Sequence, residues 1–432
     1  MENCISKSIN KDSDFFMITG EGSWNLLIGQ AVREVQQRSS AAGTSSAVVR
    51  LSDALIGKSV SYGASDLHLE PMEGFMRIRY RRDGLLQLDE RTIPKSLEAA
   101  LISRFKVMAG MDIAQRQRPQ DGHIRYSGNG GKKLDIRVSV MPVVHGERMV
   151  LRFMNLSEKL LKIGDLGFSP ENLQKFEELI HRPAGLIAIC GPMGAGKTTT
   201  LYAALEELNQ PERNMITLED PVEREIPGVN QVQLNPKAGL DYVTGLKAAL
   251  RQDTQLVLLS EIRDEQAAEM AIRIGLTGHQ VMTTLHTETA SSVIFRLLEM
   301  GIQPYLLAAT LTGIVAQRLV RRICPDCMES YAVTAGSPEA LLLGNAFKLG
   351  IKLWRGKGCC HCDGTGYRGR LALQEVLLAD EEIRQAILQR QSRQEVDILA
   401  KKQGMQTLWQ DGTAKALEGK TTLFEVRRVL YG

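Results

Sequence analysis

The 432-residue sequence has no apolar run approaching the length of about 18 residues that a membrane-spanning helix needs. Its first residues lack the basic start and apolar stretch of a secretory signal. The excess of basic over acidic residues is also small, because 53 lysines and arginines face 50 aspartates and glutamates. The resulting net charge of +3 does not by itself indicate binding to nucleic acid or to a strongly anionic surface. We therefore expect a cytosolic protein without a transmembrane segment, which can still dock onto a membrane protein.

The amino-acid composition is that of a globular protein, with 43% hydrophobic and 24% charged residues. Because one hydrophobic core rarely grows beyond about 250–300 residues, the length predicts two or three domains. Residues 1–47 are polar and end in a serine-, alanine- and glycine-rich stretch, which predicts a flexible segment. Alternation of apolar and charged residues predicts a small α+β domain over residues 48–156, followed by a linker at 157–168.

Residues 169–432 alternate apolar strands with amphipathic helices, which predicts an α/β domain with a parallel sheet and helices on both faces. Within this domain, residues 320–370 contain a cysteine-rich insert and residues 375–432 form a helical C-terminal part. The predicted strands cover residues 186–190, 215–218, 256–259 and 281–285.

A complete G-x-x-x-x-G-K-T phosphate-binding loop follows the first of these strands and precedes a helical pattern. Its residues are Gly191, Pro192, Met193, Gly194, Ala195, Gly196, Lys197 and Thr198. Glycines let backbone N–H groups turn toward phosphate oxygens, and the helix start presents its positive end to the same charge. Lys197 can reach the terminal phosphates of ATP, and the Thr198 hydroxyl can bind Mg²⁺. A chance match in a glycine-containing loop is the alternative, and the strand–loop–helix context argues against it.

Acidic residues follow two other strands at the sheet edge where this loop lies. We assign Glu261, after the most apolar strand, the role of polarising the attacking water, and Glu219 that of a second carboxylate near the metal or its waters. An acidic residue at a strand end is also a common helix cap or the partner of an arginine such as Arg263. Two such residues downstream of a phosphate loop favour the catalytic interpretation for Glu261.

Histidines and arginines are further candidates for contact with the nucleotide. His279 and His286 bracket the last predicted strand and can sense the γ-phosphate, although a lone histidine is commonly a packed or surface side chain. Arg77, Arg79 and Arg81 share one face of a strand in the small domain. They either reach a phosphate at a domain or subunit boundary or form a solvated strand face.

Five of the seven cysteines lie between residues 324 and 362. Two C-x-x-C pairs are formed by Cys324, Cys327, Cys359 and Cys362. Such clustering in a cytosolic chain favours a metal over disulfides, and four thiolates in tetrahedral reach are what structural Zn²⁺ requires. The alternatives are reduced, unliganded thiols or a ligand set that uses the spare donors Cys360 and His361.

Taken in order, the motifs resemble the ATPases of the type II secretion and type IV pilus assembly systems, in their zinc-bearing, extension-type branch. The resemblance runs from about residue 48 to the end. The matching segments are residues 63–71, 118–122, 191–200, 217–223, 261–264, 277–279, 284–287 and, after the paired cysteines, 364–370.

This resemblance implies a RecA-like ATPase domain, a small PAS-like N-terminal domain and a homohexameric ring that uses ATP and Mg²⁺. It implies that ATP hydrolysis acts on an inner-membrane platform protein, with a cytoplasmic docking protein as a further partner, to assemble pilin-like subunits. The ATPase would be peripherally associated with the inner membrane through these partners and would not bind nucleic acid directly.

The resemblance also implies roles by position. Glu219 falls in the family's acidic box and Glu261 at its Walker B glutamate. His279 and His286 fall in its histidine box, and Thr199 extends the phosphate-binding set. For contact from the small domain, the candidates are Arg79 and Arg81.

Several positions depart from the family pattern. Residues 253–255 read Asp-Thr-Gln where the family usually has Asp-Pro-Asp, and Ser260 replaces a glycine directly before Glu261. Gln115 replaces a usual glutamate, and Met193 a common threonine. We expect hydrolysis to survive, because Ser260 is small and Glu261 remains.

Three other functions compete with an assembly motor. The departures motivate a catalytically weakened, nucleotide-binding structural ring component of the same machinery. A retraction-type motor usually lacks the four-cysteine insert. A DNA-pumping ATPase is disfavoured by the near-neutral charge and by the lack of an evident basic, aromatic-rich groove.

Overall fold

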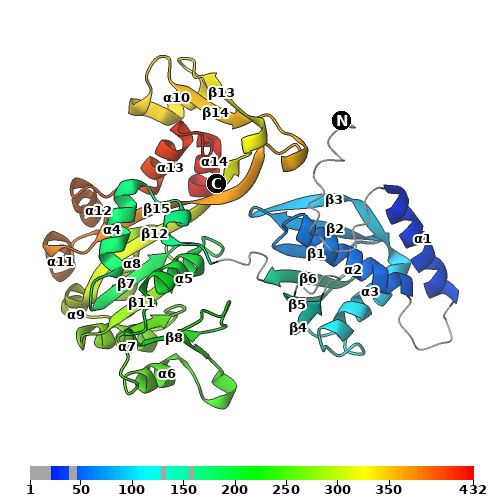
Figure 1. Cartoon of the computed structure of the whole chain (residues 1–432), viewed down its shortest axis with the longest axis horizontal. Helices are drawn as coiled ribbons and strands as arrows, with labels where there is room; N and C mark the ends of the chain where they lie inside the picture. Colours follow the sequence, from blue (N-terminus) through cyan, green and yellow to red (C-terminus); the bar gives the residue numbers. More distant parts are fainter. Residues whose placement is uncertain (1–20, 38–45, 128–132, 155–159) are drawn as a thin grey trace. The chain divides into compact units, whose positions relative to one another are not determined.

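The computed structural model describes residues 21–37, 46–127, 133–154 and 160–432 (Figure 1). The chain divides into two compact units, Met1–Glu158 and Lys159–Gly432. Within the described part, none of the helices is both long enough and apolar enough to cross a membrane.

The first unit is a six-stranded antiparallel sheet packed against three helices. Its elements are α1 (Glu21–Gln37), α2 (Ser46–Ser61), β1 (Asp66–Pro71), β2 (Phe75–Arg82), β3 (Leu85–Pro94), α3 (Lys95–Met108), β4 (Gln120–Ser127), β5 (Lys133–Val143) and β6 (Gly146–Met154). The strand order is β3-β2-β1-β6-β5-β4. Because strand residues alternate between faces, Leu67 and Leu69 of β1 enter the core with the helices, and the polar residues that alternate with them, Asp66, His68 and Glu70, lie on the opposite face.

Helix α1 lies in the segment predicted to be flexible, and that prediction is wrong for residues 21–37. Trp24, Leu27 and Ala31 recur at helical spacing and are buried in the core that α2 and α3 share. Arg91 of β3 lies over the Trp24 ring, 4.5 Å from its centroid. The rest of the predicted flexible segment lies outside the described residues, apart from the first turn of α2.

The second unit is built on a seven-stranded sheet. Its elements before the insert are η2 (Ile163–Leu166), α4 (Pro170–Ile180), β7 (Gly185–Cys190), α5 (Lys197–Leu208), β8 (Met215–Glu219), β9 (Asn230–Gln233), η3 (Pro236–Ala238), α6 (Tyr242–Ala249), β10 (Leu256–Leu259), α7 (Glu265–Leu276), β11 (Gln280–Leu285), α8 (Ala290–Glu299), α9 (Pro304–Thr310) and β12 (Leu311–Ile323). The strand order is β15-β12-β7-β11-β10-β8-β9, and neighbours are parallel except for the β12–β15 pair. The four predicted strands are confirmed.

Helices cover both faces of this sheet, as predicted. On one face, α6, α7, α8, α9, α11 and α12 form the larger core with the sheet. On the other face, η2, α4 and α5 form a second core. The predicted linker is therefore partly structured, because Ile163 and Leu166 of η2 are buried in the second unit. Ser169 caps α4 as its sequence predicts, accepting a hydrogen bond from the Asn172 N–H.

The insert and the C-terminal helices complete the second unit. They comprise η4 (Pro325–Cys327), β13 (Met328–Ala332), α10 (Pro338–Leu343), η5 (Gly344–Ala346), β14 (Lys352–Gly356), η6 (Cys360–Cys362), β15 (Tyr367–Leu378), α11 (Glu381–Leu388), α12 (Arg393–Lys402), α13 (Leu408–Leu417) and α14 (Leu423–Tyr431). β13 and β14 pair as a separate two-stranded sheet. The chain thus leaves the main sheet at the end of β12 and returns to it along β15 (Figure 1).

An ion-pair cluster joins the last helix to the main sheet. The carboxylate of Glu425 is 1% exposed and accepts hydrogen bonds from Arg321 Nη2 at 2.7 Å and Arg428 Nη2 at 2.6 Å. Burial alone would raise the pKa of Glu425, but the two guanidinium groups outweigh it and lower that pKa to about 2.

Replacing Glu425 with glutamine is expected to lower the free energy of unfolding by about 2–3 kcal/mol at neutral pH, because two partly buried arginines lose their anion. The folded-state pKa lies below the unfolded-state value of about 4.3. The stabilisation is therefore present above that value and is lost as the pH falls toward 2. Thermal unfolding of both proteins between pH 7 and pH 2 measures this difference. Glu418→Gln, which changes an exposed pair with Lys420, is the control, and a Glu425→Gln effect that does not shrink at low pH would contradict the assignment.

Candidate nucleotide site and metal centre

The phosphate loop lies between β7 and α5, at the carboxyl edge of the parallel strands. Thr198 and Thr199 are exposed in the first turn of α5, where side chains can face a bound phosphate. Pro192, Met193 and Gly194 are exposed along the loop itself. The strand–loop–helix context that the motif requires is present.

Lys197, the first residue of α5, lies over its own loop. Its Nζ donates to the carbonyl oxygens of Gly191 at 2.8 Å and Pro192 at 3.1 Å, and lies 3.4 Å from Nδ1 of His286. Burial lowers the pKa of Lys197, while the negative charge of Glu261 acts in the opposite direction. The ammonium group is therefore held by weak neutral acceptors, which an incoming phosphate can replace.

Glu261, directly after β10, reaches the same place. Its Oε2 lies 3.1 Å from Nε2 of His286, and its Oε1 accepts a hydrogen bond from Nε of Arg263. Arg263 also lies 3.7 Å from Asp220. The structure thus brings Lys197, His286 and Glu261 into one continuous chain of polar contacts beside the phosphate loop.

Glu219, at the end of β8, faces a different set of residues. Its Oε1 accepts from Thr217 Oγ1 at 2.6 Å and Gln231 Nε2 at 3.0 Å, and its Oε2 accepts from the Tyr202 hydroxyl. The residue is 1% exposed, so these neutral donors enclose it. No contact recorded for Glu219 reaches Lys197 or Glu261. These contacts anchor β8 to α5 and β9, and the place of Glu219 near the metal or its waters stays a prediction.

His279 lies at the opposite end of the sheet from the phosphate loop. Its carbonyl accepts the N–H of Gly185 at 3.0 Å, at the start of β7, whereas the loop follows the end of that strand. A strand rises about 3.3 Å per residue, which places His279 far from His286. The two histidines do not lie together, because residues that bracket a strand lie at opposite sheet edges; contact of His279 with a nucleotide stays a prediction.

The departures from the family pattern around β10 likewise lie at opposite ends of a strand. Thr254 and Gln255 precede β10, at the edge away from Glu261, where Thr254 Oγ1 donates to the Ala249 carbonyl at 2.9 Å and Gln255 Oε1 accepts from the Asn214 N–H at 2.6 Å. Of the departing positions around β10, Ser260 is the one that adjoins Glu261. Its hydroxyl lies 2.5 Å from that of Tyr242, at the start of α6.

The small-domain arginines are paired within their own sheet. Arg79 Nη2 donates to Glu70 at 2.6 Å, Arg77 Nε to the same carboxylate at 2.9 Å. Burial opposes ionisation of Glu70, but these arginines outweigh it and lower its pKa. Arg81 donates to the Gly84 carbonyl at 2.9 Å and lies 3.7 Å from Asp66. These arginines are thus ion-paired and about a third exposed, and their contact with a phosphate stays a prediction.

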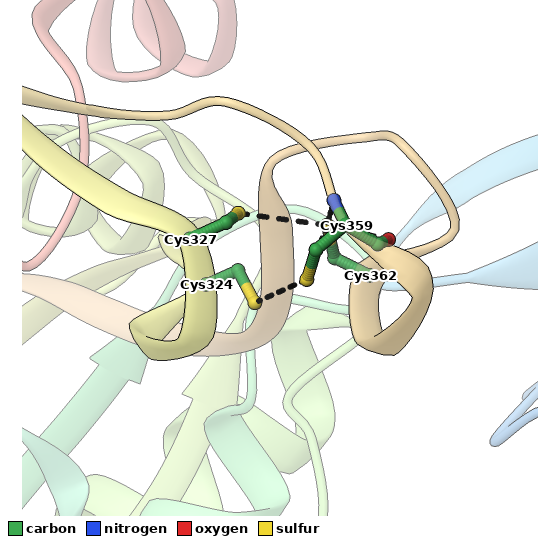
Figure 2. A group of neighbouring side chains, drawn as sticks. All are labelled: Cys324, Cys327, Cys359 and Cys362. Atoms are coloured by element: carbon green, nitrogen blue, oxygen red, sulfur yellow. Dashed lines mark hydrogen bonds between the residues drawn. The ribbon is translucent and has the colours of Figure 1, made fainter. Parts of the chain in front are cut away.

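Four cysteine thiols converge where β12 ends and where η6 precedes β15 (Figure 2). The sulfur atoms of Cys324, Cys327, Cys359 and Cys362 all lie within 4.8 Å of one another. Individual separations are 3.9 Å for Cys324–Cys359, 3.8 Å for Cys327–Cys362 and 3.7 Å for Cys359–Cys362. Tetrahedral zinc with Zn–S bonds of about 2.3 Å requires sulfur separations of about 3.8 Å. The predicted ligand set therefore fits a structural zinc ion.

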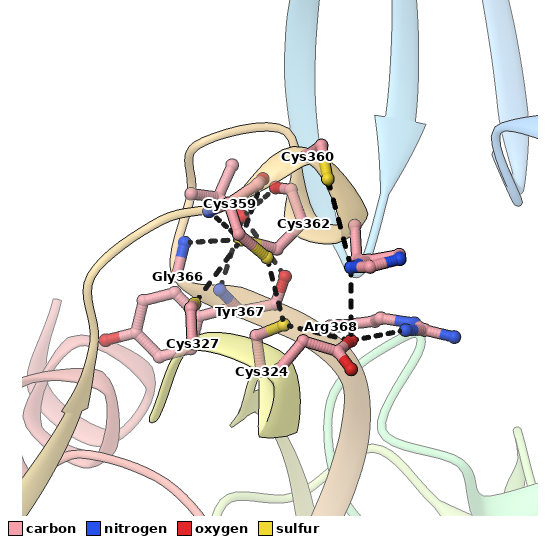
Figure 3. A network of polar contacts seen from close by, with 11 residues as sticks. Cys324, Cys327, Cys359, Cys360, Cys362, Gly366, Tyr367 and Arg368 are labelled. Atoms are coloured by element: carbon pink, nitrogen blue, oxygen red, sulfur yellow. Dashed lines mark hydrogen bonds and ion pairs between the residues drawn. The ribbon is translucent and has the colours of Figure 1, made fainter. Parts of the chain in front are cut away.

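Surrounding groups support a thiolate cluster (Figure 3). Cys362 Sγ accepts the N–H groups of Cys359 at 3.1 Å and Gly366 at 3.2 Å. Burial opposes ionisation of Cys362, but these donors outweigh it and lower the pKa of the thiol to about 7. Asp326, 3.8 Å from Cys324 Sγ, accepts a hydrogen bond from Arg368 Nη1 at 2.9 Å. The spare donor His361 lies 3.7 Å from Asp326, outside the four-sulfur group.

Sequence reasoning missed residues that support the phosphate loop from outside its motif. Gln317, on the unpredicted strand β12, contacts both the loop and α5. Tyr202, read only as part of a helix, binds Glu219. The available signal was a polar pair, Gln317 and Arg318, between the apolar residues 314–316 and 319–320.

A parallel sheet that carries a G-x-x-x-x-G-K-T loop, with a carboxylate at the end of a nearby strand, defines a P-loop nucleotide-binding protein. The family model for the type II/IV secretion system protein matches residues 41–428. The chain belongs to that family, which confirms the resemblance that the motifs carry.

Similar proteins are named as components of type IV pilus assembly and of type II secretion. The type IV pilus assembly ATPase PilB of Thermus thermophilus is 44% identical over 363 residues, which are 84% of this chain and 41% of that protein. The type II secretion system ATPase E of Vibrio cholerae is 43% identical over 383 residues, which are 88% of this chain and 75% of that protein. The chain thus spans less than half the length of the Thermus relative.

Solved structures share the fold. The ATPase DotB of Legionella pneumophila aligns with a TM-score of 0.65 at 22% identity, covering 88% of this chain and 95% of that one. The pilus retraction motor PilT with bound ADP aligns with a TM-score of 0.57 at 24% identity, covering 86% and 95%. The predicted RecA-like α/β fold is confirmed.

Proposed function

We propose that the chain hydrolyses ATP with Mg²⁺ to power assembly of pilin-like subunits through an inner-membrane platform protein, in type II secretion or type IV pilus biogenesis. The observation that carries the proposal is the convergence of Lys197, His286 and Glu261 at the phosphate loop. Family membership and the relatives named for both systems support the cellular role.

The geometry supports a division of roles. Lys197 exchanges its two loop carbonyls for the terminal phosphates, where its charge offsets the charge that develops in the transition state. Thr198 binds the metal ion, and Thr199 lies beside it in the phosphate-binding turn. Glu261 accepts a hydrogen bond from the attacking water, and His286 links this carboxylate to Lys197.

Arg263 adds a step to this scheme. Its hydrogen bond to Glu261 competes with water for one carboxylate oxygen, and a turn of Arg263 toward Asp220 or toward phosphate would leave that oxygen free for water. Arg79 and Arg81 of the small domain remain the candidates for a further phosphate contact in a homohexameric ring. The tetracysteine zinc ion has a structural role.

A structural ring component with weakened catalysis is the second candidate function. The specific observation in its favour is the Ser260–Tyr242 hydrogen bond, which adds a constraint directly before Glu261. Thr254 and Gln255 do not favour it, because they lie at the other end of β10.

Replacing Lys197 with alanine tests the proposal at the phosphate loop. Loss of a charge-assisted contact worth about 1.5–3 kcal/mol is expected to weaken ATP binding by about 10–100-fold and to abolish turnover. Calorimetric titration with ATP and phosphate-release assays measure both effects, and the exposed Lys237→Ala is the control. In cells, the Lys197 variant is expected to block secretion or pilus extension. Wild-type turnover by Lys197→Ala would overturn the proposal.

A further inference from the structure

The side-chain amide of Gln317 is bonded at both ends to the phosphate-binding segment. Its Nε2 donates to the Ala195 carbonyl at 2.7 Å, and its Oε1 accepts from Thr200 Oγ1 at 2.8 Å. Gln317 is 2% exposed, in the middle of β12, which lies beside β7 in the sheet. One buried amide therefore ties the loop and the first turn of α5 to a neighbouring strand.

The same residue lies so close to the loop that two of its glycines have no room for a side chain. A Cβ atom on Gly191 would lie 2.4 Å from the Gln317 carbonyl oxygen, and one on Gly196 would lie 2.8 Å from Gln317 Nε2. Both glycines also have positive φ, at +151° and +86°. Gln317 thus forms the surface against which the loop is shaped.

Arg318 extends this contact to the segment that carries His286. Its Nη1 donates to the Gln317 carbonyl at 3.0 Å, and its Nη2 donates to the Glu288 carbonyl at 2.9 Å. Arg318 is 9% exposed, so its contacts with these carbonyls are shielded from water. Adjacent residues of β12 therefore hold both the phosphate loop and the chain that follows β11.

We infer that Gln317 is a positioning residue for ATP: it holds the backbone N–H groups of the phosphate loop in their phosphate-binding arrangement. The inference rests on the nucleotide binding in the proposed function, and it assigns Gln317 no contact with ATP itself. Preorganised donors gain affinity because the ligand does not have to order them. Loss of Gln317 therefore affects ATP affinity more strongly than the chemical step at saturating ATP.

The test uses Gln317→Met, which keeps the length of the side chain and removes both hydrogen bonds. Its matched control is Gln280→Met, because Gln280 is also fully buried and donates to the Ile180 carbonyl at 2.9 Å, at the sheet edge away from the loop. Both variants of the full chain are compared with wild type by ATP titration calorimetry, ATPase kinetics and thermal unfolding. Thr200→Val removes only one of the two Gln317 side-chain hydrogen bonds, together with a longer contact to the Gly196 carbonyl at 3.3 Å, and serves as a milder second variant.

Gln317→Met is expected to raise the Kd and KM for ATP about tenfold or more, with kcat within about threefold of wild type. Gln280→Met is expected to lower the melting temperature without changing the Kd, and Thr200→Val to raise the Kd by a smaller factor. Wild-type affinity in both the Gln317 and Thr200 variants, with the same loss of stability as Gln280→Met, would overturn the inference and leave ATP binding intact. Failure of wild type to bind ATP would instead overturn the proposed function and the inference with it.

Discussion

Glu261→Gln is expected to lower kcat for ATP hydrolysis by about 10²–10⁴-fold, while the Kd for ATP changes by less than about threefold. An amide of the same size can replace the carboxylate in the contact with His286 at 3.1 Å, but it is a poor acceptor for the proton of the attacking water. Phosphate release at saturating ATP gives kcat, and titration calorimetry gives the Kd.

The matched control for this prediction is Glu265→Gln, in the exposed first turn of α7, four residues further along the chain. It removes a carboxylate of the same charge without a recorded contact to Lys197, His286 or Glu261. The control is expected to retain wild-type kcat. If Glu261→Gln kept more than about a tenth of wild-type kcat, Glu261 would not be the group that polarises water.

Cys362→Ser is expected to reduce the zinc content from one ion per chain to near zero and to unfold the insert. Structural zinc contributes about 10–16 kcal/mol of binding free energy in small domains, which is far more than a small apolar core can replace. The core of the insert contains few buried apolar side chains, which include Val333, Leu343 and Leu353. Metal analysis measures the zinc content, and thermal unfolding together with limited proteolysis between residues 324 and 366 measures the unfolding.

His361→Asn is the matched control, because His361 is an exposed potential metal ligand of the same turn and lies outside the group of four converging sulfur atoms. It is expected to retain one zinc ion and wild-type resistance to protease. Near-zero metal in the wild-type protein, or full zinc content in Cys362→Ser, would contradict the assigned ligand set.

Much of the nucleotide site could be predicted from local patterns. The phosphate loop is a continuous motif, and buried parallel strands are recognisable as short apolar runs, so the positions of Lys197 and Glu261 at one sheet edge followed from strand direction. The cysteine spacing likewise predicted a ligand set that the sulfur separations fit. These features depend on residues that are close in sequence or on one sheet edge.

The features that were missed depend on contacts across the fold. Gln317 lies more than a hundred residues from Ala195, and its role follows only from the pairing of β12 with β7. His279 and His286 lie at opposite sheet edges, because the six-residue strand that they bracket separates them. Helix α1 was missed because only a narrow apolar stripe, including Trp24 and Leu27, marks a mainly polar segment.

Glu219 shows why a motif does not specify a side-chain environment. The sequence placed it correctly after β8, at the same edge as Glu261, but the direction of its carboxylate depends on Tyr202 and Gln231. Those partners come from α5 and β9, and β9 was not predicted. A carboxylate at a strand end can therefore face either the ligand or the fold, and only the contacts distinguish the two.

The measurement that tests the central claim most directly is phosphate release from Mg·ATP by the purified wild-type chain, with Glu261→Gln measured beside it at the same protein and nucleotide concentrations. The account predicts steady multiple turnover by wild type and a rate lower by about 10²-fold or more in the variant. Equal rates in the two proteins would contradict the claim that this phosphate loop and Glu261 form a hydrolytic site, and would favour the structural ring component.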